Sequence, residues 1–462
     1  MKSLPLSVLA QILGSGPAEG FDISIAGVNT DTRTIKKGDC FFAITGENFD
    51  GHNYVHQAFT KGAACAVVER TIGAPEPADG PVLRVRNTIQ ALGDLACAYR
   101  RMSGFKVVAL TGSVGKTTTR QIVHHVLSRH FRVHQAQKSF NNNIGLPLTL
   151  LGAEPDTQIV VAELGANHPG EIAPLTRIAQ PDVALVTNAH PAHLAGFGNL
   201  ATIVREKLSI AEGLSQDGTL IINGDIEPLV AACRERGKPF RTFGKSRGVD
   251  YRAENIACEA LHSTFTIGGT QIRAPLPGPG NVENALAAWA ICAQFGLTLD
   301  AFAPALENLP TVSMRAEAMK IGTLTVLNDC YNANPASMKN ALAMLHNLRP
   351  DGDAQRGRRL VFICGEMAEL GPQTEALHAE LGEAVAEAGV DLLVTVGAPP
   401  RTTAQTARQT ARYDLQTRSF DDTLSACNHL QEFIQQDDII LVKGSRTARL
   451  EQVVNELIKD YG

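Results

Sequence analysis

One segment constrains the fold of this chain more than any other. It is FKVVALTGSVGKTTT, residues 105–119, and it is followed by an amphipathic stretch, QIVHHVLSRH. The apolar beginning of the segment is typical of a buried strand, and the amphipathic stretch is typical of a helix. The segment therefore predicts a strand, a tight glycine loop and a helix in that order, as at the start of a parallel α/β unit.

The glycine loop favours a phosphate ligand. Its backbone can fold tightly around an anion with its N–H groups pointing inward, and the helix N-terminus adds a partial positive charge. Lys116 can reach the terminal phosphates of a nucleotide, and the hydroxyl of Thr117 can bind Mg²⁺. The candidate phosphate-binding residues are Gly112, Ser113, Val114, Gly115, Lys116, Thr117 and Thr118.

The loop departs from the full G-x-x-x-x-G-K-[ST] motif, because Leu110 stands in place of the first glycine. A chance G-x-x-G-K-T sequence in an ordinary loop is the alternative. The flanking strand and helix patterns favour the phosphate loop. We therefore expect the protein to bind a nucleoside triphosphate.

The pattern of apolar segments predicts an α/β protein with three domains, 1–86, 87–313 and 314–462. The first contains short alternating segments. The second and third alternate near-continuous apolar strands with helices, which indicates parallel sheets covered on both faces. Residues 251–276 add a small antiparallel hairpin around Gly268-Gly269, and the third domain resembles a doubly wound, Rossmann-like layout.

Composition excludes several classes of protein. The net charge is −5 and no long basic block occurs, so nucleic acid is not expected as the main ligand. No apolar window is long enough to predict a membrane span. The nine cysteines are scattered without zinc spacing, which favours buried thiols in a reducing cytoplasm. The N-terminal apolar run is interrupted by Gln11, so it predicts a first helix rather than a signal peptide.

Three residues are candidates for metal binding, each with a plainer alternative. Glu163 ends the apolar run QIVVAELG, where a carboxylate near a phosphate loop can hold Mg²⁺; a helix cap or a surface carboxylate is the alternative. His193 follows another apolar run and is either a second metal ligand or a solvated loop histidine. Lys207 lies in a charged helical stretch, where a solvated surface lysine is the expected reading.

Other polar clusters are compatible with ligand binding or with local structure. Asn142 and Asn143 in NNNIGLP either line a substrate channel or satisfy a turn. Asn281 and Asn284 share one face of a helix start; their amides can contact an adenine edge, or Asn281 can cap the helix.

A second group of polar residues lies around the proposed junction of the second and third domains and beyond it. Arg315 can neutralise phosphate, and Asp329 can accept hydrogen bonds from ribose hydroxyls. The turn KGSR at 443–446 lies between a predicted strand and a predicted helix and favours anions.

Together these residues resemble the ATP-dependent Mur ligases of peptidoglycan synthesis, over nearly the whole chain. TGSVGKTT is similar to the family's TGTxGKT loop, which itself lacks the distant first glycine, so Leu110 is no longer an exception. Lys207 follows His193 at the spacing of the lysine that relatives carry as a carbamate. The resemblance therefore changes the expectation for Lys207 from a surface residue to the precursor of a Mg²⁺ ligand.

The resemblance implies roles for the nucleotide and metal residues. ATP is expected with two Mg²⁺ ions, the first held by Thr117 and Glu163 and the second by His193 and carbamylated Lys207. Lys116 is expected to contact the transferring phosphoryl group. Asn281 and Asn284 are expected near adenine, with Arg315 and Asp329 joining the nucleotide to the third domain.

Several segments are most similar to the family member that acts on UDP-N-acetylmuramoyl-tripeptide and D-alanyl-D-alanine: NNNIGLPLTLL, ELGANHPGEI, NDCYNANPAS, GEMAELG and LVKGSR. The segment NTDTR…GDCFFAITGENFDGH is similar to a UDP-binding domain. The resemblance thus implies a UDP site at Thr30, Asp31, Thr32, Arg33, Asn48 and Phe49. The further substrate-binding candidates are Asn142, Asn143, Asn167, His168, Asn332, Lys443, Ser445 and Arg446.

The implied reaction is ATP-dependent formation of an amide bond through an acyl phosphate, in the cytoplasm, by a monomer. It would serve cell-wall synthesis, cell shape and cell division. Two rivals remain. The first is another ligase of the superfamily, such as the preceding Mur ligase or folylpolyglutamate synthase. The second, of another class, is a nucleotide-dependent switch without ligase chemistry.

Overall fold

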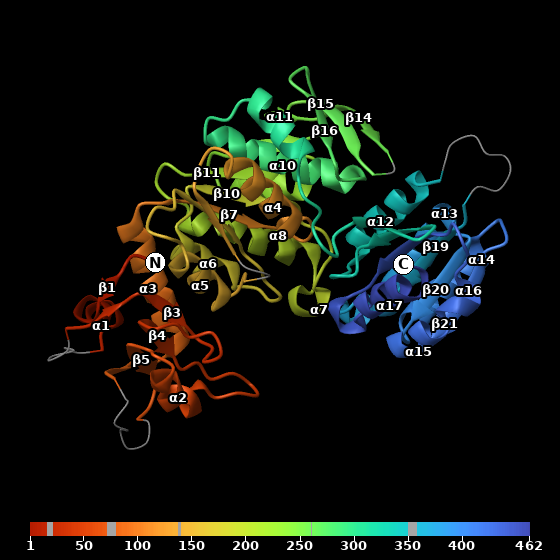
Figure 1. The fold of residues 1–462 in the computed structure, drawn as a ribbon. Helices are drawn as coiled ribbons and strands as arrows, with labels where there is room; N and C mark the ends of the chain where they lie inside the picture. Colours follow the sequence, from red (N-terminus) through yellow and green to blue (C-terminus); the bar gives the residue numbers. More distant parts are fainter. Residues whose placement is uncertain (16–21, 72–79, 137–139, 260, 350–357) are drawn as a thin grey trace.

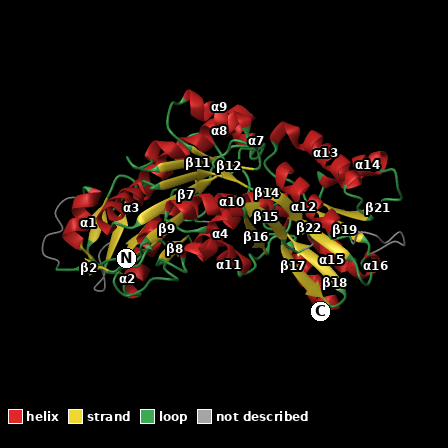
Figure 2. Ribbon diagram, turned by 90° about the horizontal axis from the view of Figure 1, so that it is seen from above, coloured by secondary structure: helices red, strands yellow, loops and turns green. Residues whose placement is uncertain are grey.

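The computed structural model describes residues 1–15, 22–71, 80–136, 140–259, 261–349 and 358–462. Its strands form three main sheets that follow one another along the chain, with helices around each (Figure 1). Seen from above, strands lie between helices in the central and C-terminal parts of the molecule (Figure 2). The predicted α/β class is confirmed by this arrangement.

The first sheet is parallel and has the order β3-β4-β5-β6. Its strands are β3 (Gly27–Asn29), β4 (Asp39–Phe42), β5 (Cys65–Val68) and β6 (Val82–Arg84). Beside it lie the antiparallel pair β1 (Leu4–Pro5) and β2 (Ser24–Ile25), the helix α1 (Leu6–Leu13), the 3₁₀ turn η1 (Gly51–Tyr54) and α2 (Val55–Thr60). The first helix expected from the sequence is therefore present.

The central sheet is parallel, with seven strands in the order β13-β12-β11-β10-β7-β9-β8 among the described residues. The strands are β7 (Lys106–Thr111), β8 (Val133–Gln135), β9 (Ile159–Glu163), β10 (Val183–Val186), β11 (Thr219–Asn223), β12 (Arg241–Gly244) and β13 (Tyr251–Arg252). Strand β7 lies between β9 and β10, so the carboxyl ends of these three strands meet where the strand order reverses. Ligands of open parallel sheets bind at such a point.

Both faces of the central sheet are buried, which explains its near-continuous apolar strands. Val107 and Ala109 of β7 pack in one cluster with residues of α3, α5 and α6, while Val108 and Leu110 pack in another with α4 and α10. The helices here are α3 (Thr88–Ser103), α4 (Lys116–Leu127), α5 (Gly145–Leu151), α6 (Ile172–Ala179), α7 (Leu194–Phe197), α8 (Leu200–Leu208), η2 (Ser209–Gly213) and α9 (Glu227–Glu235).

A small antiparallel sheet extends the central part, as the hairpin signal predicts. It consists of β14 (Glu254–Cys258), β15 (Ser263–Ile267) and β16 (Thr270–Ala274), and Gly268-Gly269 turns between the last two. The helices α10 (Pro279–Gln294) and α11 (Leu299–Glu307) follow. Helix α10 has Gly278 at its N-cap, so the capping role considered for Asn281 is wrong: Asn281 lies inside the first turn.

The third sheet has the order β17-β18-β22-β19-β20-β21, and only the β17–β18 pair is antiparallel. The strands are β17 (Glu317–Ile321), β18 (Leu324–Asn328), β19 (Leu360–Cys364), β20 (Leu392–Val396), β21 (Gln416–Phe420) and β22 (Ile439–Lys443). The helices are α12 (Pro335–Asn347), η3 (Gly371–Gln373), α13 (Thr374–Glu387), α14 (Pro400–Thr410), α15 (Thr423–Asn428), α16 (Leu430–Phe433), η4 (Arg446–Ala448) and α17 (Glu451–Tyr461).

The sequence patterns miss the peripheral strands β8, β12, β13, β17 and β21, which are short or carry exposed residues that break the apolar run. Of the nine free thiols, Cys97, Cys258 and Cys427 are only half-buried, so the expectation of uniformly buried cysteines is wrong for these three. No helix among the described residues is long and apolar enough to cross a membrane.

Candidate active site

Both loop glycines are required by close contacts as well as by backbone conformation. Gly112 and Gly115 have φ of 149° and 83°. A Cβ atom on Gly112 would lie 1.9 Å from Oγ1 of Thr187, and one on Gly115 would lie 2.0 Å from Oδ1 of Asn284. Because side chains at these positions would collide with their neighbours, the loop can form only with glycine there.

The loop is fixed by two residues that the sequence patterns do not single out. Oδ1 of Asn188 accepts hydrogen bonds from the N–H groups of Ser113 and Val114, at 3.1 and 2.9 Å, and the hydroxyl of Thr187 donates to the carbonyl of Val114 at 2.6 Å. Both residues follow β10. Polar side chains at the end of an apolar strand are the sequence feature by which these two residues could have been found. Their hydrogen bonds occupy two of the loop amides expected to face an anion.

Lys116 begins α4, and its ammonium group donates to the carbonyl of Gly112 at 2.6 Å. Burial lowers the pKa of Lys116, while the nearby Glu163 carboxylate opposes that shift and Arg315 adds to it. The ammonium group therefore lies inside the loop, at the N-terminus of a helix, as the phosphate-loop interpretation predicts.

Glu163 lies at the carboxyl end of β9 and faces the start of α4. Its two oxygens accept from the hydroxyl of Thr117 at 3.0 Å and from the amide of Asn141 at 3.1 Å. Glu163 is buried, so the reading of it as a surface carboxylate is wrong. A hydroxyl and a carboxylate side by side form an oxygen-rich pair of the kind that Mg²⁺ requires.

Two guanidinium groups add positive charge around this pair. Nε of Arg120 lies 4.0 Å from Oε2 of Glu163, and Arg315 donates to Oγ1 of Thr117 at 3.5 Å while stacking 4.2 Å from the ring centre of Tyr331. Within the described chain, the buried Nε atoms of Arg120 and Arg315 have no hydrogen-bond partner. With Lys116, three cations lie close to the Thr117–Glu163 pair, which carries a single carboxylate, so the site favours a polyanionic ligand.

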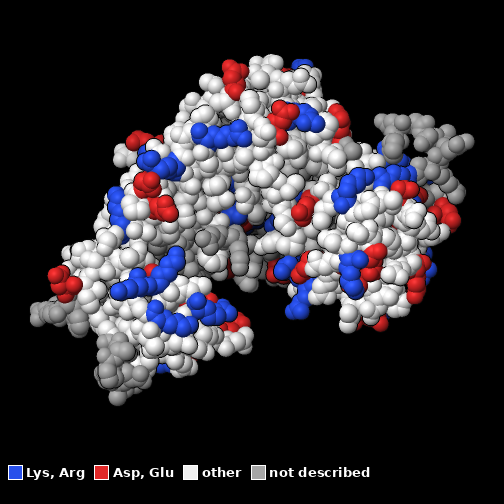
Figure 3. Space-filling view, in the orientation of Figure 1, with Lys and Arg blue, Asp and Glu red and all other residues white. Residues whose placement is uncertain are grey.

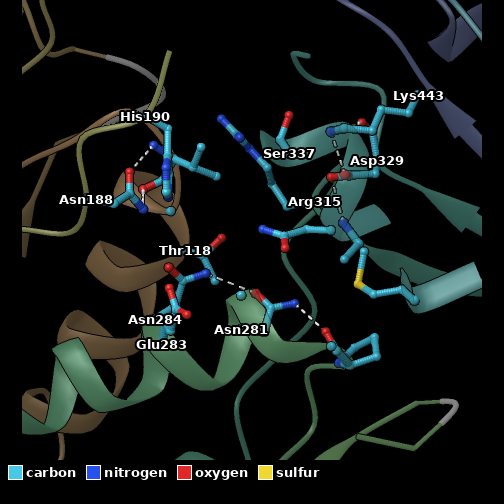
Figure 4. A pocket seen from close by; sticks show the side chains of 18 residues that line it. Thr118, Asn188, His190, Asn281, Glu283, Asn284, Arg315, Asp329, Ser337 and Lys443 are labelled. Atoms are coloured by element: carbon cyan, nitrogen blue, oxygen red, sulfur yellow. Dashed lines mark hydrogen bonds and ion pairs between the residues drawn. The ribbon is translucent and has the colours of Figure 1, made fainter. Parts of the chain in front are cut away.

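A cavity between α10 and the third sheet lies next to the loop. Figure 4 shows Asn281 and Asn284 on its α10 side, with Asp329 and Lys443 on the opposite side and Arg315 between them. The amide of Asn284 donates to Oδ1 of Asn281 at 3.0 Å, and that of Asn281 donates to the carbonyl of Pro277 at 2.8 Å. Thr118 lines the same cavity.

Lys443, buried at the end of β22, forms an ion pair with the partly buried Asp329, which follows β18. The ammonium group of Lys443 donates to Oδ2 of Asp329 at 2.6 Å, and the N–H of Ala316 donates to Oδ1 at 3.0 Å. Met314 and Ala316 adopt positive φ on either side of Arg315. Asp329 therefore holds the segment from which Arg315 reaches the phosphate loop.

A second cavity, of about 1040 Å³, is lined by the loop, by Glu163 and His193, and by residues of α3 and α6. Asn142, Asn143, Asn167 and Asn332 line it as well. Oδ1 of Asn142 also accepts from the N–H groups of Ile144 and Gly145, so this residue satisfies a turn while it borders the cavity. In the space-filling view, the molecule is hollowed between its N-terminal and C-terminal parts (Figure 3).

The other substrate candidates lie in three different environments. His168 is exposed beside Glu171, and Arg446 lies 3.3 Å from Glu451. Ser445 is buried, and its hydroxyl accepts from the N–H of Ala368 at 2.8 Å. These three do not line either of the two cavities as the described residues define them.

The residues expected at a UDP site are grouped in the N-terminal part, close to β3 and β4. Asp31 pairs with Arg33 at 2.6 Å, which lowers the pKa of Asp31 to about 2, and the hydroxyl of Thr32 donates to Gln57 at 2.8 Å. Thr30 lies in the same turn, and Phe49, next to Asn48, stacks on Tyr54 with ring centres 5.1 Å apart. None of these UDP candidates lines either of the two cavities described above.

Lys207 is not the surface residue that its charged helix suggests. Its side chain is 2% exposed, and its nitrogen lies 5.3 Å from the ring centre of Phe197. Burial, reinforced by the charge of Lys116, lowers the pKa of Lys207 to about 7. Near neutral pH a large share of this amine is therefore uncharged, which is the nucleophilic form of a lysine.

Replacing Lys207 by methionine is expected to stabilise the protein, because the buried amine must lose its proton or remain charged in a poorly solvated place. The lowered pKa makes this cost largest below pH 7, and it declines as the pH rises toward 10.5. In CO₂-free buffer the melting temperature of Lys207→Met should exceed that of the parent, with the gap widest at pH 6 and smaller at pH 9. Calorimetry at both pH values checks this, and a gap that grows with pH would contradict it.

His193 is held by a residue of the loop that follows strand β19 of the third sheet. Its Nδ1 atom contacts the carboxylate of Glu369, which follows β19. Burial lowers the pKa of His193, and Glu369 opposes that shift. His193 also lines the cavity that contains Lys116 and Glu163, so the structure brings these three candidates together. Among the described residues, no group of three or more His, Cys, Asp or Glu side chains forms a metal cluster.

Comparison with known proteins agrees with this geometry. Three family models match: "Mur ligase family, catalytic domain" over residues 24–100, "Mur ligase middle domain" over 110–292 and "Mur ligase, glutamate ligase domain" over 314–446. The UDP-N-acetylmuramoyl-tripeptide–D-alanyl-D-alanine ligase of Escherichia coli K12 is 37% identical, covering 99% of both chains.

Solved structures are similar over the same length. The crystal structure of MurF from Acinetobacter baumannii matches with a TM-score of 0.88 and 31% identity over 100% of both chains. MurF ligase from Thermotoga maritima in complex with ADP matches with a TM-score of 0.81 and 25% identity, covering 94% of this chain and 97% of that one.

The strand–loop–helix unit, the cationic loop and the Thr117–Glu163 pair define a P-loop protein that binds ATP. Its sheets and full-length relatives define the class further, as an ATP-dependent ligase that forms C–N bonds. The chain belongs to the Mur ligase family.

Proposed function

We propose that this protein joins D-alanyl-D-alanine to UDP-N-acetylmuramoyl-tripeptide. ATP would be converted to ADP and phosphate, and the product would be UDP-N-acetylmuramoyl-pentapeptide, a peptidoglycan precursor made in the cytoplasm. The proposal follows the activity named for the Escherichia coli relative. It also follows from the chemistry of a site that places a phosphate loop and a large cavity side by side.

The reaction needs a site that tolerates concentrated negative charge. A peptide carboxylate is a poor acyl donor, and transfer of the γ-phosphoryl group converts it to a reactive acyl phosphate. The neutral amine of D-alanyl-D-alanine then attacks, and phosphate leaves. Bringing a carboxylate to within 4 Å of a phosphate charge costs about 4 kcal/mol at an effective dielectric of 20. Lys116, Arg120 and Arg315 supply compensating positive charge.

The oxygen donors present fit Mg²⁺. Thr117 and Glu163 would hold one ion, which keeps waters and binds phosphate oxygens besides one or two protein ligands. His193 and a carbamate on Lys207 would hold a second. The buried, largely uncharged amine of Lys207 is suited to react with CO₂. Bound Mg²⁺ would neutralise charge on the phosphates during transfer.

The proposed contacts to the nucleotide and the peptide are assigned from the residues that line the two cavities. Asn281 and Asn284 would contact adenine, and Arg315 and Asp329 would tie the nucleotide to the C-terminal part. Asn142, Asn143, Asn167 and Asn332 would line the path of the peptide toward the phosphate loop. His168, Lys443, Ser445 and Arg446 stay candidates for D-alanyl-D-alanine or peptide contacts, although Lys443 is already paired with Asp329.

The loops that follow β3 and β4 would bind the UDP group. Phe49, stacked on Tyr54, offers an aromatic face to uracil, while Thr30, Thr32 and Asn48 would contact the ribose and diphosphate, beside the Asp31–Arg33 pair. We propose the domain boundaries at 86/87 and 313/314, and a monomer as the working form.

The observation that carries this proposal is that Lys116, Glu163, His193 and the cavity asparagines line one space. We expect phosphate release from ATP only when both UDP-N-acetylmuramoyl-tripeptide and D-alanyl-D-alanine are present. A panel of UDP-tripeptides carrying meso-diaminopimelate or lysine would identify the preferred third residue. Hydrolysis that needs neither substrate would favour a nucleotide switch, and use of a single amino acid in place of the dipeptide would favour another ligase of the superfamily.

A further inference from the structure

The loop that follows β19 touches the central part of the protein at His193. The carboxylate of Glu369 contacts Nδ1 of His193, and the N–H of Ala195 donates to the carbonyl of Glu369 at 3.0 Å. Gly371 lies against Ala195 as well, since a Cβ atom on Gly371 would be 3.3 Å from the Cα atom of Ala195. One short loop thus engages both the side chain and the backbone at the start of α7.

The loop after β19 is anchored by Ser445, which follows the neighbouring strand β22, and by His378 of α13. The N–H of Ser445 donates to the carbonyl of Glu366, and the hydroxyl of Ser445 accepts from the N–H of Ala368, both at 2.8 Å. The N–H of Met367 donates to the ring of buried His378 at 3.3 Å. Glu369 is therefore presented to His193 from a rigid base rather than from a free loop.

The backbone at the contact is held in an uncommon conformation on both sides. His193 has φ of 51° and Glu369 has φ of 61°. Non-glycine residues adopt the left-handed region rarely, and such backbones cost free energy unless the surrounding contacts require them. Two facing residues in this conformation indicate that the contact is specified by the fold.

The chemistry of the pair determines which ring atom of His193 remains available. A carboxylate accepts hydrogen bonds only, so the Nδ1 atom that contacts Glu369 must carry the proton. The neutral ring then has its lone pair on Nε2, the atom through which it can bind a metal. Histidine ligands commonly donate their other ring N–H to a carboxylate in this way.

We propose that Glu369 is a positioning residue that fixes the tautomer and orientation of His193, so that the C-terminal part completes a metal site in the central part. This inference rests on the proposed function for the presence and identity of a metal ion at His193, whereas the Glu369–His193 contact stands on the geometry alone. Because linkage is reciprocal, docking of the loop strengthens metal binding by the same factor by which metal binding strengthens docking. The ligase would thereby bind its second ion tightly only with the C-terminal part in place.

The tautomer is tested in the metal-free protein with ¹⁵N-labelled histidine. Nitrogen NMR should show His193, assigned by comparison with His193→Asn, protonated at Nδ1 alone. Glu369→Gln preserves size and backbone, and it should shift His193 toward a mixture of tautomers. Glu375→Gln, at an exposed carboxylate early in α13, serves as the matched control and should leave the signals unchanged. Identical His193 signals in the parent and Glu369→Gln would overturn the proposal.

The effect of Glu369 on metal binding is tested by titrating the protein with Mn²⁺ in the presence of a non-hydrolysable ATP analogue. Electron paramagnetic resonance detects the bound Mn²⁺. Glu369→Gln should weaken the second Mn²⁺ about 10- to 100-fold, as is typical when a carboxylate partner of a metal-binding histidine is removed. A tautomer change with unaltered Mn²⁺ affinity would overturn the positioning role. If the parent itself bound no Mn²⁺ with the analogue, the metal roles under the proposed function would fail, and with them this half of the inference. The NMR result would still decide the Glu369–His193 contact.

Discussion

Lys116→Ala should lower the rate of ATP-dependent ligation about 10³-fold or more. The ammonium group lies in the phosphate loop at the N-terminus of α4, where it donates to the carbonyl of Gly112. Removing a single uncharged donor to a developing negative charge already costs about 10²- to 10³-fold in kcat. Loss of a full positive charge beside a triphosphate and a carboxylate should cost at least as much.

The same variant should bind the UDP-tripeptide almost as tightly as the parent. The residues expected to hold the UDP group lie in loops that follow strands β3 and β4 of the first sheet, whereas Lys116 begins α4 beside the central sheet. Calorimetric titration with the UDP-tripeptide, beside a phosphate-release assay, separates the two effects. Lys106→Ala is the matched control, since Lys106 is an exposed lysine at the start of the strand that leads into the loop. Turnover of Lys116→Ala close to that of the parent would remove the phosphate-loop assignment.

Lys207→Ala should lose activity about 10²-fold or more, and short carboxylic acids should restore part of it. The alanine side chain leaves space in a buried pocket, and formate or acetate can place a carboxylate where a carbamate on the lysine would lie. In the parent, the lowered pKa of about 7 keeps much of the amine uncharged near neutral pH. Only the uncharged amine reacts with CO₂, so the carbamate should be lost as the pH falls below 7.

The rescue is measured as turnover against the concentration of formate, acetate and propionate. It should saturate, and it should be absent when the same acids are added to Lys116→Ala, in which a cation rather than an anion is missing. Carbon NMR of the parent in ¹³C-bicarbonate should show a carbamate signal that Lys207→Ala lacks. Full activity of Lys207→Ala without any acid would return Lys207 to a purely structural role.

Local patterns in the chain were sufficient to predict several parts of the fold and the site. The glycine loop after β7, the helix α4 that follows it and the hairpin at Gly268-Gly269 are each formed by residues close together in sequence. Periodicity and the conformational needs of glycine are properties of short segments, so they can be read without knowing the neighbours. Glu163 could be picked out as a candidate for a similar reason, because polar groups at the ends of parallel strands meet at one edge of the sheet.

Other features depend on contacts between distant residues. Asn188 fixes the phosphate loop across strands β7 and β10, and Lys443 pairs with Asp329 at a sequence separation of 114. Glu369 reaches His193 across a separation of 176. A charged helix such as α8 does not reveal which of its side chains its neighbours will cover, so the burial of Lys207 could not be inferred from the helix itself.

Parallel α/β sheets and a loop for phosphate could be inferred from the order of residues alone, because strand periodicity and paired glycines act over a few residues. The burial of Lys207, the gathering of Lys116, Arg120 and Arg315 at the Thr117–Glu163 pair, and the contact of Glu369 with His193 emerge only in the folded molecule. Those properties arise from the solvation and charge around each group, and both are set by elements that lie far apart along the chain.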